Sequence, residues 1–416
     1  MNLEQIVFGG NQNEFEEEEE KENIKKNKAP VWVDPDDLSL IVKPEIQITE
    51  GESYADALRE KFAQVQDGID LSWTHKTPEA EPQTIDGGSV FSEDSFLPSD
   101  ILHITRVANL FGGADEHIRI NDLIFDPSQE RAAILDSKGA IHLISVDPKR
   151  CSIQATITRS NDIPRFCLCF TRDGAKLISG CGRGNFHVID CKTYNVDICR
   201  IPSANTDDIK SVHCSPDNTI LVMLSDRKVH FLDCQTRRLI KTVSSSDDLY
   251  CGAFSDDGSL FVAAGSKGFG LFFNVKTFSP ISRFQEPEGQ IIKSVSISHG
   301  RVAIGTEAGV LHIFDIDSIQ SSPHPTPLFT KMNLTTAIDT IVFHPKGELL
   351  VFASSQKKDS LRVLHMAARK VFSNWPTKQT PLSYVRKVAF DAKGQYLSFG
   401  NDKGKCLLWE LPFYAQ

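Results

Sequence analysis

The chain has 416 residues, of which 40% are hydrophobic and 24% are charged, close to the averages for globular proteins. Its formal charge of −10 is unevenly distributed: residues 1–100 hold 24 acids and 8 bases, a net of −16, whereas residues 101–416 hold 31 acids and 37 bases, a net of +6. The N-terminus has no basic stretch followed by a long apolar run, and the longest apolar runs are far too short to cross a bilayer, so we expect neither a secretory signal nor a membrane contact.

The first 97 residues are predicted to form an acidic, mostly disordered tail. Seven glutamates stand between Glu14 and Glu22, and a small cluster of lysines follows them. Such a segment has too little apolar area to offset the loss of chain entropy on folding. A solvated spacer is the simpler interpretation of the glutamates, and a specific acidic docking site is the alternative.

Two short segments of this tail are candidate partner-docking motifs. The first places a tryptophan beside three carboxylates: Trp32, Asp34, Asp36 and Asp37. The second spaces apolar side chains by four, four and three residues, as on one stripe of a helix: Tyr54, Leu58, Phe62 and Val65. A helix of about three turns is marginal alone in water, so this stripe needs a surface to cover. That surface belongs either to the protein's own body or to a partner.

From residue 98 onward, one unit is repeated seven times. Each copy reads as a short strand, a tight turn, an apolar strand, a second turn and a third strand. The last apolar residue of the first strand recurs every 40 to 47 residues: Phe125, Phe170, Cys214, Phe254, Ile297, Phe343 and Phe390. This period is typical of the four-stranded blade of a β-propeller.

The ends of the repeat array predict how the ring closes. The dipeptide Trp409-Glu410 is the nearest counterpart of the Trp-Asp that ends the third strand of WD repeats. The seventh copy stops too early to supply a fourth strand, and the segment 101–107 is a spare strand upstream that would hide the open edge. We therefore predict an all-β fold, a seven-bladed WD40-type β-propeller over residues 98–416, preceded by the acidic tail 1–97.

The motifs of common catalytic and metal sites are missing from the sequence. The glycine-rich segment 180–184 is expected at a turn between two strands, without the helix that a phosphate loop needs. His187, His230 and His312 recur at one strand position, which indicates a periodic structural role. All ten cysteines lie at or beyond Cys151 without a CxxC pair, so we expect reduced, buried thiols. We accordingly predict no enzyme activity, no metal and no cofactor.

The turns between second and third strands share one face of a propeller, and six of the seven carry a base. Nine bases against five acids leave these turns with a net charge of +4. A basic face can engage phosphates without reading sequence, whereas solvated turn lysines are the alternative. No aromatic side chains interleave with these turns. The candidates for contact with an RNA backbone are Arg183, Arg227, Lys228, Lys267, Lys357, Lys358, Lys403 and Lys405.

Several segments together resemble one known family. In the body these are Asn374-Trp375-Pro376-Thr377, Thr380-Pro381-Leu382, the run from Phe399 to Lys405, Leu334-Thr335-Thr336-Ala337-Ile338 and the run from Lys358 to His365. In the tail they are Val7-Phe8-Gly9-Gly10, Trp32-Val33-Asp34 with Asp36-Asp37, and Tyr54 through Leu58-Arg59 to Phe62, in matching order. The chain resembles the U3 small nucleolar RNA-associated protein 18 family, which are WD40 proteins of the small-subunit processome.

The resemblance implies a non-enzymatic scaffold in the nucleus, in the nucleolus, that serves pre-rRNA processing and the maturation of 18S rRNA and the 40S subunit. The implied partners are other processome proteins, especially WD40 propeller subunits, together with the U3 small nucleolar ribonucleoprotein and pre-rRNA. Some members also recruit the exosome helicase through an aromatic–Asp motif in the tail, of which Trp32-Val33-Asp34 is the nearest counterpart here. The alternative is a peptide-binding WD40 adaptor, either a ubiquitin-ligase substrate receptor or a chromatin adaptor.

Overall fold

The computed structural model describes residues 97–112, 118–128, 130–147, 151–158, 164–204 and 207–415. All of them belong to Phe91–Gln416, the second of two units into which the chain divides. The tail candidates Trp32, Asp34, Asp36, Asp37, Tyr54, Leu58 and Phe62 lie outside the described residues. Their role, and the domain boundary at residue 97, stay predictions. Within the described ranges, no helix has the length and apolarity that a membrane crossing requires.

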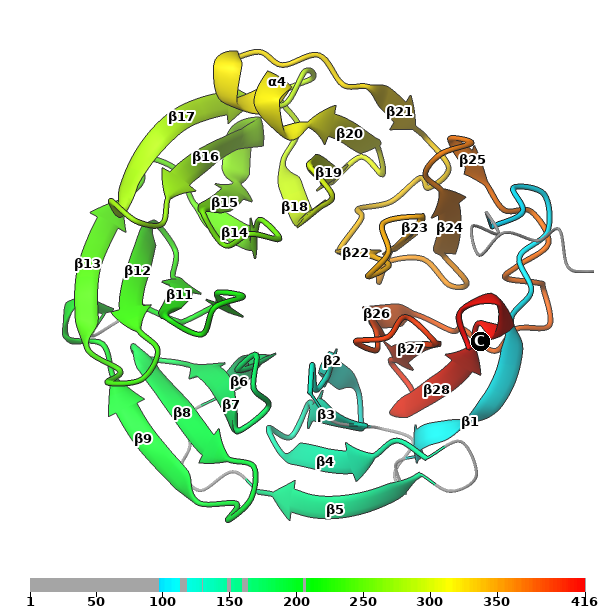
Figure 1. The fold of residues 1–416 in the computed structure, drawn as a ribbon, viewed down its shortest axis with the longest axis horizontal. Helices are drawn as coiled ribbons and strands as arrows, with labels where there is room; N and C mark the ends of the chain where they lie inside the picture. The colour runs from blue at the N-terminus through cyan, green and yellow to red at the C-terminus, as the bar shows by residue number, and fades with distance from the viewer. Residues whose placement is uncertain are drawn as a thin grey trace, which may run out of the picture. The chain divides into compact units, whose positions relative to one another are not determined.

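Seven antiparallel sheets of four strands are arranged in a ring, so the predicted propeller is confirmed (Figure 1). The first strand of each sheet lines the centre: β2 (Ile120–Phe125), β6 (Arg165–Phe170), β10 (Ser211–Cys214), β14 (Leu249–Phe254), β18 (Ile292–Ser298), β22 (Thr340–Phe343) and β26 (Val385–Phe390). The second strands follow outward: β3 (Arg131–Asp136), β7 (Lys176–Cys181), β11 (Ile220–Leu224), β15 (Leu260–Gly265), β19 (Arg301–Thr306), β23 (Leu349–Ala353) and β27 (Tyr396–Asn401). We number the blades 1 to 7 in this order.

The outer half of each blade holds the third and fourth strands. The third strands are β4 (Ile141–Ser145), β8 (Asn185–Asp190), β12 (Lys228–Asp233), β16 (Phe269–Asn274), β20 (Leu311–Asp315), β24 (Leu361–His365) and β28 (Lys405–Glu410). The fourth strands are β5 (Ser152–Ile157), β9 (Val196–Arg200), β13 (Leu239–Ser244), β17 (Ser279–Gln285), β21 (Phe329–Lys331), β25 (Lys370–Val371) and β1 (Thr105–Gly112). Short helices occur at η2 (Pro202–Ala204), η3 (Ser266–Gly268), α4 (Ile316–Ser321) and η4 (Pro412–Tyr414).

The predicted repeat matches the strands closely. Six of the seven residues aligned at the end of the first strand are the last residue of that strand, and the exception, Ile297, precedes the last residue of β18. The second strands are almost wholly buried, since both of their faces are covered by neighbouring blades. The hydrophobic core is accordingly divided into seven clusters, one between each pair of adjacent blades.

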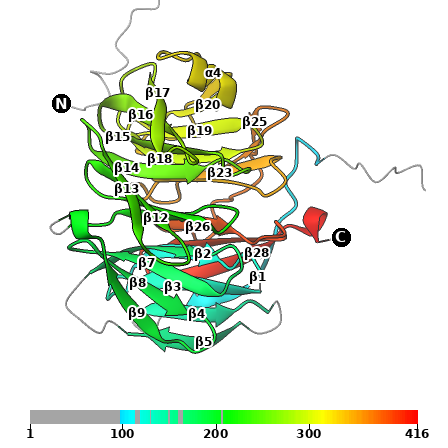
Figure 2. The ribbon, with the colours of Figure 1, turned by 60° about the vertical axis from the view of Figure 1, so that its left-hand side comes forward.

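The ring closes through β1, which pairs with β28 as the fourth strand of blade 7 (Figure 2). This strand spans 105–112, so the predicted bounds of 101–107 were wrong. Upstream of β1, the backbone N–H and C=O of Leu102 bond the side-chain amide of Asn374, at 3.1 and 2.8 Å. Because a side chain satisfies both groups, this apolar segment needs no strand partner.

The same contact explains part of the sequence signature that includes Asn374. The neighbouring Trp375 is buried and packs edge-on against Trp409, with ring centroids 5.4 Å apart. These residues hold the last blade and the closing segment together. Their role in the described part of the chain is therefore structural.

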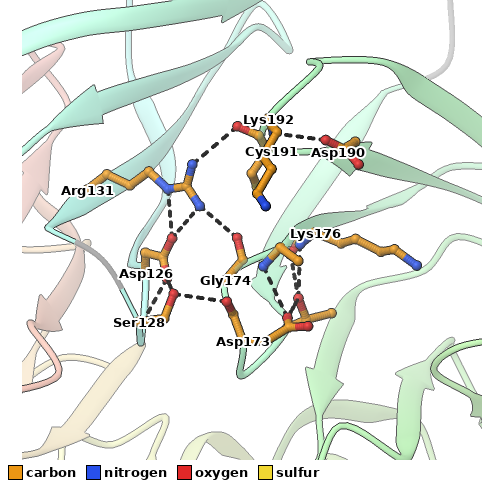
Figure 3. Close-up of polar contacts among 11 residues, drawn as sticks. Asp126, Ser128, Arg131, Asp173, Gly174, Lys176, Asp190, Cys191 and Lys192 are labelled. Atoms are coloured by element: carbon orange, nitrogen blue, oxygen red, sulfur yellow. Dashed lines mark hydrogen bonds and ion pairs between the residues drawn. The ribbon is translucent and has the colours of Figure 1, made fainter.

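A buried polar network joins blades 1 and 2, and we call it the 1–2 seam (Figure 3). The guanidinium of Arg131 donates to the Asp126 carboxylate at 2.7 Å, to the carbonyl of Gly174 at 2.7 Å and to that of Cys191 at 3.2 Å. Gly174 has a positive φ of 65°, and a Cβ atom there would lie 2.2 Å from the Asp126 carboxylate. Glycine is thus required twice at this turn, for its backbone conformation and for the close approach of blade 1.

Candidate binding surface at the channel and its turns

The turns between second and third strands share a face with the loops that join one blade to the next. The backbone N–H of Gly184 in the turn of blade 2 donates to Asp207 O at 2.7 Å, and Leu249 N–H donates to Asp226 O at 2.7 Å. We call this side of the ring the turn face. The net charge of the turn face therefore comes from the side chains of both the turns and the blade-to-blade loops.

Three of the predicted RNA-contacting bases are ion-paired on this face. The pairs are Arg227 with Asp248 at 2.8 Å, Lys228 with Asp207 at 2.8 Å, and Lys267 with Asp247 at 3.3 Å. All three acids belong to blade-to-blade loops, which the sequence-based count of the turns left out. The net positive charge around blades 3 and 4 is therefore lower than the turns alone indicate.

The other predicted bases have a different environment. Within the described residues, none of the side chains of Lys357, Lys358, Lys403 and Lys405 forms an ion pair, and Lys357 Nζ donates to Thr335 Oγ1 at 3.2 Å. The side chain of Arg183 is exposed at the tip of its turn, where the residue has a positive φ of 59°. Among the predicted RNA-contacting bases, those without an ion pair to a described acid thus lie mainly on blades 6 and 7.

A central channel of about 520 Å³ runs between the first strands. Its charged lining residues are four bases and two acids: Arg172, Lys210, Lys293, Lys387, Asp122 and Asp339. The ammonium of Lys387 lies 3.7 Å from the Asp122 carboxylate, whose other oxygen accepts the backbone N–H of Leu168 at 2.7 Å. The channel is consequently polar and net basic.

One histidine and two cysteines that line the channel are neutral near pH 7. Burial, and secondarily the charge of Lys387, lower the pKa of His213 to about 4. Burial raises the pKa of the Cys169 and Cys251 thiols to about 12. A catalytic cysteine needs thiolate character, and these two thiols lack it. The lining therefore offers hydrogen bonds and fixed charges for binding.

The third-strand histidines are structural in this fold, as their periodicity indicated. His230 contacts the hydroxyls of Ser225 and Thr242 at 3.1 and 3.0 Å, and His312 lies 2.9 Å from the Glu286 carboxylate. No group of three or more His, Cys, Asp or Glu residues among the described positions could hold a metal ion. The segment 180–184 forms the end of β7 and a tight turn, also as predicted.

The sequence analysis missed one set of residues at the mouth of the channel. Counting four positions back from the aligned end of each first strand gives one residue per blade, which we call the mouth ring: Asn121, Phe166, Lys210, Tyr250, Lys293, Asp339 and Arg386. Five of the seven line the channel, namely Phe166, Lys210, Tyr250, Lys293 and Asp339. The repeat alignment contained this signal. The predicted basic surface comprised the turns alone, whereas these residues stand at the start of the first strands, which line the channel.

A closed ring of seven four-stranded sheets around a basic channel defines the class of protein: a seven-bladed β-propeller of the WD40 type. This fold serves many unrelated functions, so the class alone does not give an activity.

Comparison with known proteins shows which proteins the chain is similar to in sequence. No family model matches the chain. A U3 small nucleolar RNA-associated protein 18 homolog of Homo sapiens is 25% identical, covering 96% of this chain and 77% of its own length. The homolog of Mus musculus is 26% identical over 99% of this chain and 84% of its own. U3 small nucleolar RNA-associated protein 18 of Saccharomyces cerevisiae is 42% identical over 27% of this chain and 19% of its own. The resemblance of this chain to the U3 small nucleolar RNA-associated protein 18 family is confirmed.

Proposed function

We propose that this protein is a non-enzymatic scaffold of the small-subunit processome, acting in the nucleolus on pre-rRNA and needed for maturation of 18S rRNA and the 40S subunit. The observation that carries the proposal is similarity over nearly the whole chain, tail included, to proteins named for association with U3 small nucleolar RNA. The architecture suits this role, because a ring whose blades share buried clusters is a rigid platform with several separate surfaces.

The partners of the proposed scaffold are other processome proteins, especially WD40 propeller subunits, and the U3 ribonucleoprotein with pre-rRNA. The tail segments at Trp32 and at Tyr54 to Phe62 dock on protein neighbours in this proposal. Recruitment of the exosome helicase through Trp32-Val33-Asp34 is a narrower part of it.

Purification of the tagged protein from cells tests the proposal. RNA is sequenced after crosslinking, and partner proteins are identified by mass spectrometry. Enrichment of U3 RNA and pre-18S spacer sequence is the expected result. Ubiquitin-ligase or histone subunits without ribosomal precursors would instead establish the alternative, a peptide-binding adaptor.

The tail is tested by the double substitution Trp32→Ala with Phe62→Ala. We expect this variant to leave large complexes on a sedimentation gradient while its thermal melting stays unchanged, because both substitutions fall in the tail 1–97 and not in residues 98–416 of the propeller. The matched control is Phe15→Ala with Trp73→Ala, which removes the same two ring types from tail positions outside the motifs. Equal sedimentation of all three proteins would refute docking through these residues.

The basic turns of blades 6 and 7 are tested by charge reversal of Lys357, Lys358, Lys403 and Lys405 to Glu. These four are the natural targets because none of them is ion-paired with a described acid. RNA crosslinking should fall, since each substitution removes a cation that can neutralise one phosphate. Crosslinking at the parent level would eliminate these turns as an RNA surface.

A further inference from the structure

The mouth ring has a structural basis that recurs in five of the seven blades. In blades 1, 2, 4, 5 and 7, the pairing of the first two strands shifts by one residue at the ring position, as in the step from Ile292 opposite Thr306 to Ser294 opposite Gly305. In blades 3 and 6, Lys210 and Asp339 donate their backbone N–H to Leu224 O and Ala353 O. In the five blades with this shift, the ring residue is the extra residue of a β-bulge, a device that re-aims a side chain.

Around four consecutive blades, the ring alternates between aromatic rings and bases. The order from blade 2 to blade 5 is Phe166, Lys210, Tyr250 and Lys293. All four line the channel, and Phe166 is 37% exposed although it is a large apolar residue. A partly exposed aromatic ring that lines a polar channel next to a lysine position offers a face on which a nucleic-acid base can stack.

We call the mouth-ring residues of blades 2 to 5 the arc. The two lysines of the arc contact the Tyr250 ring and nearby acids, but their side chains stay partly exposed. The ammonium groups of Lys210 and Lys293 lie 5.5 and 5.1 Å from the centroid of the Tyr250 ring. Lys210 also pairs with Asp226 at 2.5 Å and Lys293 with Glu307 at 3.6 Å, both acids of the turn face. The two lysine side chains stay 38% and 29% exposed, so each ammonium keeps donor capacity for a ligand.

We infer that the mouth ring of blades 2 to 5 binds a single strand of RNA, with bases stacked on Phe166 and Tyr250 and phosphates held by Lys210 and Lys293. A single strand presents base faces and phosphates in regular alternation, and the arc presents rings and ammonium groups in the same alternation. An acidic peptide would use the lysines but has no regular partner for the rings. The choice of RNA over DNA rests on the function proposed above.

The test uses the full chain and a fluorescein-labelled oligouridine strand of twelve nucleotides, with fluorescence anisotropy at several salt concentrations. Phe166→Leu and Tyr250→Leu should each weaken binding about tenfold, because the substitution abolishes stacking and keeps apolar volume. Lys210→Gln with Lys293→Gln should reduce the slope of log K against log salt by about 1.4, since each phosphate that a lysine neutralises contributes roughly 0.7.

Lys346→Gln is the matched control. It also removes a lysine from a tyrosine ring, that of Tyr414 at 5.1 Å, but it lies in the turn between first and second strands, outside the channel. Its affinity and salt slope should equal those of the parent. Asp226→Asn tests whether misfolding accounts for weaker binding in the other variants. This substitution removes the acid partner of Lys210, so it should tighten RNA binding, which a damaged fold cannot do.

The outcomes separate this inference from the proposed function. Parent protein that co-purifies with U3 RNA from cells but does not bind oligouridine overturns the inference and leaves the scaffold proposal standing. Oligouridine affinity that is equal in the parent and all mouth variants also overturns it. Preferential binding of a decaglutamate peptide, weakened by the lysine substitutions, would assign the mouth to acidic peptides instead. Variant-sensitive oligouridine binding without U3 RNA in cells would support the inference and refute the processome role.

Discussion

The 1–2 seam and the mouth ring both combine bases with acids, and they differ in how completely those groups are satisfied. In the seam, the side chains of Arg131 and Asp126 are 8% and 0% exposed, and the guanidinium donates to one carboxylate and two carbonyls. At the mouth, Lys210 and Lys293 are about a third exposed and make one ion pair each. A saturated buried network holds a fold together, whereas a half-satisfied exposed one has capacity for a ligand.

The largest effect is expected from breaking the seam with Arg131→Met. The substitution leaves the Asp126 carboxylate and two carbonyls buried without their cation, which should cost about 3–5 kcal/mol in the free energy of unfolding. Urea denaturation measures the change. Arg172→Met, an exposed arginine of blade 2, should shift the free energy of unfolding by no more than about 0.5 kcal/mol. Similar losses of stability for the two variants would contradict the special role of the seam.

A smaller effect is expected from acid, through buried histidines such as His230. Burial lowers its pKa from 6.5 to about 4 in the folded state, so the unfolded chain takes up a proton first as the pH falls. The stabilising contribution is complete above pH 6.5 and declines between pH 6.5 and 4, by at most about 1.4 kcal/mol per pH unit. Lys228 lowers and Asp207 raises this pKa in addition.

The variant His230→Gln isolates this contribution. Its free energy of unfolding, measured in urea from about pH 7 to about pH 4.5, should fall less steeply than that of the parent, because one titrating group is gone. His187 and His344 have pKa values lowered to about 4 by burial as well, so part of the decline should remain. Parallel curves for parent and variant would show that His230 does not titrate differently on unfolding.

The smallest effect on stability is expected at the mouth. Lys210→Gln and Lys293→Gln remove ion pairs whose lysines are about a third exposed, and such pairs contribute less than about 1 kcal/mol. The melting temperature should therefore stay close to that of the parent while RNA affinity changes. A destabilisation comparable to that of Arg131→Met would make the mouth lysines structural, like the arginine of the seam, and would remove the contrast between the two regions.

Much of the fold could be predicted from the sequence because each blade is local. Apolar strands separated by tight turns repeat every 40 to 47 residues, and the residue that ends each first strand is marked by its hydrophobicity and the turn after it. The closing strand was misplaced by four residues at its start, because Leu102 looks like a strand residue until the distant Asn374 is known to satisfy its backbone. Contacts across 272 positions leave no local pattern.

The sequence by itself determined the ring of seven blades, the family resemblance and the turn positions of the basic residues, since all of these depend on spacing along the chain. Only the tertiary structure decided which charges are neutralised, because Asp207, Asp247 and Asp248 reach their basic partners from loops that enter the next blade. It also decided that Phe166, Lys210, Tyr250 and Lys293 gather at one opening. Residues some forty positions apart become neighbours because the ring brings equivalent positions of successive blades side by side.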